Sequence, residues 1–120
     1  MFKSGWEWFS SRVVYSTQGL ITAWCEERSF RIWACMNMIS CIAAFALPLG
    51  GPYRAAIICL GLLILAAECM NTAIERVVDQ ISTTHTPLGK AAKDTGSAGV
   101  AVAAIAAGVA WGFGLYDWLA

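Results

Sequence analysis

Five polar residues recur at helical spacing in the segment 55–81. They are Glu68, Asn71, Thr72, Glu75 and Asp79. At about 100° per residue, all five positions fall within roughly a 100° arc of one helix face. Carboxylate and amide oxygens are ligands that Mg²⁺ accepts, and a carboxylate can also take up a proton. The spacing therefore predicts a face that holds a cation and the phosphates bound to it.

The elements that carry this face are expected to lie in a membrane. Hydrophobic residues make up 58% of the chain and charged residues 13%, whereas soluble domains average about 45–50% apolar residues. Three apolar segments, 32–49, 55–74 and 95–116, are long enough to cross a bilayer as helices. Acids at the end of the second segment are costly at membrane depth, which indicates a functional site. The Gly- and Ala-rich third segment favours close helix packing.

The first 31 residues differ from these spans because aromatic residues alternate with charges and hydroxyls. This pattern predicts an amphipathic helix at the membrane interface over 1–31; a flexible tail is the alternative. Basic residues concentrate before the first span and between the second and third. The positive-inside rule therefore places the N-terminus and the helix end and loop 75–94 on the cytoplasmic side. One membrane domain, 1–120, is expected, of all-α class.

Composition also excludes several classes of protein. The formal net charge is zero, so no nucleic-acid partner is expected. His85 is the only histidine, and the five cysteines contain no CxxC pair; neither a histidine-rich metal site nor a disulfide framework is predicted. Charges interrupt the N-terminal segment, so no cleavable signal peptide is expected.

The segment 68–94 reads ECMNTAIERVVDQISTTHTPLGKAAKD. It resembles the prokaryotic diacylglycerol kinase family, which includes the undecaprenol kinases. The family pattern is Glu-x-x-Asn-Thr/Ser-Ala-Ile-Glu-x-x-x-Asp, then a loop of about this length and Ala-Lys-Asp. The matching residues are Glu68, Asn71, Thr72, Ala73, Ile74, Glu75, Asp79, Ala92, Lys93 and Asp94.

The resemblance implies a small kinase of the bacterial cytoplasmic (inner) membrane. Such enzymes are homotrimers with three membrane helices per chain, and neighbouring chains combine to form the active sites. They transfer the γ-phosphoryl group of Mg-ATP to a lipid hydroxyl. Consistent with a fold unlike soluble kinases, this sequence lacks a G-x-x-x-x-G-K-[ST] loop and a protein-kinase glycine loop.

The resemblance also implies residue roles. Glu75 is the expected catalytic base and, with Glu27, a metal ligand. Residues expected at the lipid substrate are Ser16, Arg31, Glu68 and Asn71. Residues expected at the nucleotide are Tyr15, Glu27, Asp79, Lys93 and Asp94. Structural alternatives stay open for several of them: Asp79 as a helix cap or a partner of Arg76, Asn71 as an interhelical hydrogen-bond residue, and Lys93 as a positive-inside anchor.

The lipid substrate is the least determined expectation. Gly96-Ser97-Ala98 fits the Gram-negative branch of the family, whereas the run from His85 to Lys90 looks like the Gram-positive branch. Diacylglycerol is the first expectation and undecaprenol the alternative. Two other classes stay open: a cation or proton transporter subunit, and an assembly subunit whose polar face joins helices. The apolar outer half of the second span disfavours the transporter.

Overall fold

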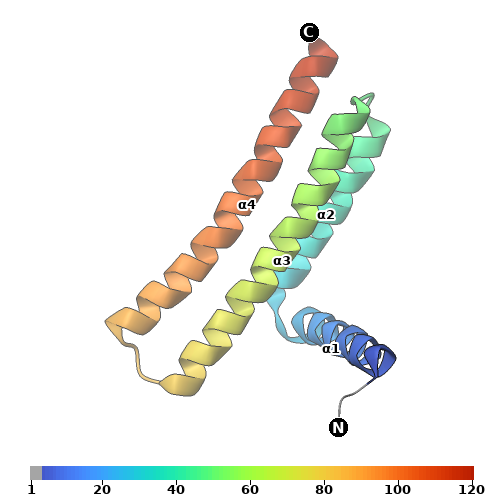
Figure 1. Ribbon diagram of the computed structural model, residues 1–120. Coiled ribbons are helices and arrows are strands. Elements are labelled where there is room, and N and C mark those ends of the chain that lie inside the picture. Colours follow the sequence, from blue (N-terminus) through green and yellow to red (C-terminus); the bar gives the residue numbers. More distant parts are fainter. Residues whose placement is uncertain (1–3) are drawn as a thin grey trace.

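The computed structural model describes residues 4–120, and within them the chain is all helical apart from short connections (Figure 1). The helices are α1 (Gly5–Glu26), α2 (Arg28–Ala46), α3 (Gly51–Ile81) and α4 (Pro87–Leu119). The predicted all-α class is confirmed. Residues 1–3, which begin the expected surface helix and include Lys3, lie outside the described residues.

Local sequence accounts for where the helices start. Ser4 and Glu7 form a capping box at the start of α1, because each side chain accepts a hydrogen bond from the other residue's backbone N–H. At α4 the Thr86 hydroxyl accepts a hydrogen bond from Gly89 N at 3.0 Å, and Pro87 occupies the first turn. A proline also opens α3, where no backbone donor is needed.

Three of the helices are long and apolar enough to cross a membrane: α2, α3 and α4, with 19, 31 and 33 residues. This confirms the expected number of membrane helices and makes the chain a multi-pass membrane protein. The segment 75–94, expected as a helix end and loop, is mostly helical, since only 82–86 lie outside α3 and α4. These extensions carry the polar residues of α3 and α4 on regular helix.

Helix α3 packs along both α2 and α4, whereas α1 turns away from the bundle at the end where the α3–α4 loop lies (Figure 1). The core near the opposite end contains Ala44, Leu49 and Ile57. There the Arg54 side chain donates hydrogen bonds to Ala44 O at 2.8 Å and Leu49 O at 3.2 Å. Arg54 thereby satisfies one carbonyl group at the end of α2 and one in the connection between α2 and α3.

Most large apolar side chains of the bundle point outward. Ile39 and Phe45 on α2, Leu62 on α3, and Ile105 and Phe113 on α4 are all more than half exposed. Soluble monomers rarely expose so much contiguous apolar surface. The outward faces of α2, α3 and α4 are therefore suited to lipid or to other helices within a bilayer.

Candidate functional site

A cavity of ≈ 330 Å³ lies between α2, α3 and α4 at the end of the bundle that carries the α3–α4 loop. Three of the predicted site residues line it from α3: Glu68, Asn71 and Glu75. Helix α2 contributes Ser29 and Trp33, and α4 contributes Ser97, Val100 and Ala101. The helical periodicity that placed the acids on one face thus brings them to a shared cavity.

Glu68 is the more deeply placed acid, with only 3% of the residue exposed. A buried carboxylate is costly unless a partner or ligand satisfies it. Glu75 lies two turns further along the same face and is half-buried. A cavity with one deep acid and one nearer to the membrane surface suits a lipid whose polar end is bound and whose apolar part stays in the bilayer.

Asn71 connects this acidic pair to α4. Its Nδ2 donates a hydrogen bond to Glu75 Oε1 at 3.2 Å. Its Oδ1 is buried without a hydrogen-bond partner, and a Cβ on Gly96 would lie 2.5 Å from that oxygen. The absence of a side chain on Gly96 therefore lets α4 approach Asn71, which in turn holds Glu75.

Glu27 lies at the break between α1 and α2 and does not line the cavity that holds Glu75. Its backbone is extended, with φ −105° and ψ 113°. The Arg76 guanidinium donates from Nη2 to Glu27 Oε1 at 2.9 Å and to Glu26 Oε2 at 2.8 Å. Arg76 therefore pairs with the α1–α2 junction and not with Asp79.

Asp79, Lys93 and Asp94 gather at the start of the loop between α3 and α4. Lys93 Nζ donates to Asp79 Oδ1 at 2.6 Å, and Asp94 pairs with Lys90 one turn earlier. All four residues line a cavity of ≈ 260 Å³ that the loop completes. The cavity offers both cations and carboxylates, which is a composition suited to a nucleotide and its phosphates.

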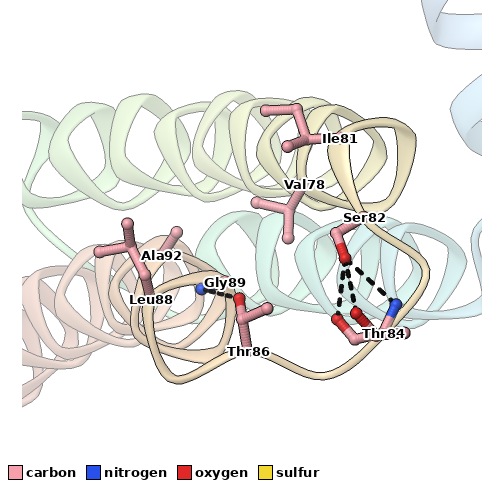
Figure 2. A pocket seen from close by; sticks show the side chains of 8 residues that line it. All are labelled: Val78, Ile81, Ser82, Thr84, Thr86, Leu88, Gly89 and Ala92. Carbon is pink, nitrogen blue, oxygen red and sulfur yellow. Dashed lines mark hydrogen bonds between the residues drawn. The ribbon is translucent and has the colours of Figure 1, made fainter.

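An apolar cavity of ≈ 260 Å³ lies beside this polar one, between the end of α3 and the start of α4 (Figure 2). Val78, Ile81, Leu88 and Ala92 provide its apolar wall. The loop at its edge is ordered by Ser82, whose hydroxyl accepts a hydrogen bond from Thr84 N at 3.3 Å and bonds to the Thr84 hydroxyl at 2.9 Å (Figure 2). The short loop is therefore held by its own side chains.

Four predicted site residues, Glu27 and the three that follow, line none of these cavities. Tyr15 and Ser16 are exposed in the middle of α1, and neither lines any cavity named above. Arg31 donates from Nη1 to Trp24 O at 2.8 Å and Cys25 O at 3.1 Å, so it caps the end of α1. Within one chain, the structure does not bring these three side chains to Glu75.

The carboxylates offer limited protein ligands for a metal. Within residues 4–120, no three His, Cys, Asp or Glu side chains come together as a metal site. Mg²⁺ commonly uses only one or two carboxylates, with water and substrate phosphates completing its shell. Glu75 on the cavity wall and Glu27 at the helix junction are carboxylates of the kind that such a shell uses.

Sequence reasoning missed Gly96 as a neighbour of Asn71, and it missed Arg76 as the partner of Glu26 and Glu27. Gly96 carried only a weak signal, a glycine on the first turns of an apolar span. The partners of Arg76 lie 50 and 49 residues away along the chain, so no local spacing indicates them.

Comparison with known proteins identifies the family of the chain. A family model described as prokaryotic diacylglycerol kinase matches residues 14–115. Proteins named diacylglycerol kinase from Pseudomonas aeruginosa and Escherichia coli are 39% and 36% identical over 97 residues, covering 81% of this chain and 79% and 80% of theirs. One of that name from Haemophilus influenzae is 39% identical over 101 residues, 82% of this chain and 83% of its own length. Since the matched residues include those that line the three cavities and nearly all of the three membrane helices, the chain belongs to the prokaryotic diacylglycerol kinase family.

Proposed function

We propose that this chain is an ATP-dependent kinase that phosphorylates the hydroxyl of diacylglycerol and produces phosphatidic acid. The family match and the relatives named diacylglycerol kinase support this substrate, and they do not favour undecaprenol. The observation that carries the proposal is the position of Glu75. Asn71 holds its carboxylate on the wall of a cavity between three membrane helices.

The reaction needs a base beside the lipid hydroxyl. As that oxygen attacks the γ-phosphorus of ATP, the bond from phosphorus to the β–γ bridging oxygen breaks and ADP leaves. The hydroxyl proton passes to the Glu75 carboxylate. Asn71 fixes the position of that carboxylate, and Glu68, deeper in the cavity, accepts a hydrogen bond from the glycerol end of the lipid. Ser16 and Arg31 are the further residues we assign to the lipid substrate.

The nucleotide occupies the polar cavity at the loop. Lys93 supplies positive charge to the phosphates, and Asp79 and Asp94 hold the lysines in place until the nucleotide binds. Tyr15 from α1 is assigned to the nucleotide by the family resemblance. The metal is Mg²⁺, with Glu27 and Glu75 as its protein ligands, and when bound it neutralises charge on the phosphates.

A homotrimer is the assembly we propose. Tyr15 and Ser16 do not reach the cavity within one chain, which supports a site completed by a neighbouring chain. The apolar outward faces of the membrane helices offer surface for such an assembly. We place the protein in the bacterial inner membrane with α1 and the α3–α4 loop on the cytoplasmic side, since both lie at one end of the bundle.

The test is phosphoryl transfer from ATP by purified protein in mixed micelles that contain diacylglycerol or, separately, undecaprenol. Glu75→Gln keeps the size of the side chain and removes the base, so we expect the activity to be lost. Asp117→Asn makes the same chemical change near the far end of α4 and should retain full activity. A fully active Glu75→Gln variant would remove the role of Glu75, and transfer to undecaprenol alone would remove the proposed substrate.

A further inference from the structure

Arg76 lies next to the proposed base in the sequence but faces away from its cavity. It lines a separate hollow between α1 and α3, whereas Glu75 lines the one between α2, α3 and α4. Its guanidinium is nevertheless bonded to Glu27, the second proposed metal ligand. We propose that Arg76 is a positioning residue, which holds the Glu27 carboxylate against α3 for the metal ion of the reaction.

The backbone at Glu27 restricts the orientation of the side chain only weakly. Glu27 is the single residue between α1 and α2, with extended dihedral angles. Helix α1 is mostly exposed and has only Ala23 buried. Over residues 4–120, the two bonds of Arg76 are the only ion pairs that connect this junction with α3. Without them, the direction of the Glu27 carboxylate is set by a short and exposed hinge.

The bond leaves Glu27 able to bind a metal. Arg76 Nη2 contacts Oε1 of Glu27, and a carboxylate has two oxygens with about four lone-pair sites. The second oxygen therefore remains suitable as a metal ligand. Outer partners of this kind orient metal-binding carboxylates and restrict their motion, so that less order has to be imposed when the ion binds.

Glu26 offsets the positive charge that Arg76 brings close to the proposed metal ligand Glu27. Arg76 donates to both glutamates through the same nitrogen. The three side chains together carry one net negative charge, so the cluster still attracts a cation. Glu26 is the more exposed of the two acids, with 63% of its side chain accessible against 26% for Glu27. Glu26 therefore acts as the counter-charge of Arg76, and Glu27 remains available for the ion.

This proposal rests on the proposed function, in which Glu27 is a metal ligand. The test is direct binding of Mn²⁺, used as a probe for Mg²⁺, to purified protein in detergent, followed by electron paramagnetic resonance. Loss of an outer partner typically weakens metal binding by about 10- to 100-fold. Because Arg76 is partly exposed, we expect Arg76→Ala to weaken Mn²⁺ binding by about 10-fold, at the lower end of that range.

Three further variants separate the possible explanations. Arg76→Lys keeps a cation within reach of both glutamates and should restore most of the affinity. Arg12→Ala removes an arginine from the middle of α1 and should bind Mn²⁺ like the original protein. In phosphoryl transfer, Arg76→Ala should raise the Mg²⁺ concentration needed for half-maximal rate and reach nearly the original kcat at saturating Mg²⁺.

Glu27→Gln distinguishes failure of this proposal from failure of the proposed function. If Glu27→Gln weakens Mn²⁺ binding but Arg76→Ala binds it equally or more tightly, Arg76 does not position Glu27. If Glu27→Gln itself binds Mn²⁺ like the original protein, Glu27 is not a metal ligand, and both the metal assignment and this proposal are wrong.

Discussion

The approach of α4 to Asn71 makes Gly96→Ala a sensitive test of the site. A Cβ at position 96 would lie 2.5 Å from Asn71 Oδ1 and 3.4 Å from Ile74 Cδ1. Non-bonded heavy atoms in good contact are separated by about 3.5 Å or more, so the amide has to move by roughly 1 Å. Asn71 cannot move that far and keep its 3.2 Å hydrogen bond to Glu75.

Two effects of this substitution can be estimated. Overpacking costs about 1–3 kcal/mol, and replacing glycine by alanine within a helix returns about 0.8–1.0 kcal/mol. The free energy of unfolding should therefore fall by no more than about 2 kcal/mol. A hydrogen bond to a charged group contributes about 1.5–3 kcal/mol. If Glu75 needs that bond in the transition state, kcat should fall by about 10- to 100-fold.

Gly61→Ala is the matched control. A Cβ at position 61 would also lie 2.5 Å from an asparagine oxygen, that of Asn37 on α2, at a contact outside the catalytic cavity. Both variants are assayed for thermal unfolding by circular dichroism and for phosphorylation of diacylglycerol in mixed micelles. We expect similar losses of stability and a selective loss of kcat in Gly96→Ala. Equal kcat values for the two folded variants would refute the argument that Asn71 positions Glu75.

Three other predictions concern separate contacts. Trp111→Phe removes the 2.8 Å hydrogen bond from Nε1 to Ser40 Oγ and should lower the free energy of unfolding by about 0.6–1.5 kcal/mol. A double-mutant cycle with Ser40→Ala, measured by detergent denaturation, should give a coupling energy of that size, and zero coupling energy would contradict the prediction. Lys93→Ala breaks a partly exposed ion pair with Asp79 and should change stability by less than about 1 kcal/mol, while the KM for ATP rises; an unchanged KM would exclude Lys93 from the nucleotide site. Arg54→Ala removes hydrogen bonds to Ala44 O at the end of α2 and to Leu49 O in the following connection. It should destabilise the fold by about 1–3 kcal/mol in thermal unfolding and leave the KM for ATP unchanged.

The membrane helices could be predicted from the sequence because apolar runs of about 20 residues have few alternatives. The polar face of α3 could also be predicted, since 3.6-residue periodicity fixes which side chains share a face. The helix over 87–94, which had been expected as part of a loop, was not predicted. Polar sequence of that kind is compatible with both helix and loop, and contacts between α3 and α4 decide between them.

Contacts between distant segments were the part that sequence reasoning could not reach. The family resemblance named Glu27 and Glu75, but the pairing of Arg76 with the α1–α2 junction depends on how α1 is placed on the bundle. Sequence order also suggested Arg76 as a partner for Asp79, three positions away. The structure instead joins Asp79 to Lys93 across the loop, because α4 returns alongside the end of α3.

The unbroken course of α3 fixes how deep each acid lies. Counting from Gly51 at about 1.5 Å per residue, Glu68 lies about 26 Å and Glu75 about 36 Å along the helix axis. A bilayer has a hydrocarbon thickness of about 30 Å. With Gly51 at one edge, Glu68 is therefore below the opposite edge and Glu75 just above it. Because Glu75 stands about 6 Å beyond that edge, a bilayer thickened by about 6 Å would bring the base to the hydrocarbon boundary, so catalysis should respond to membrane thickness.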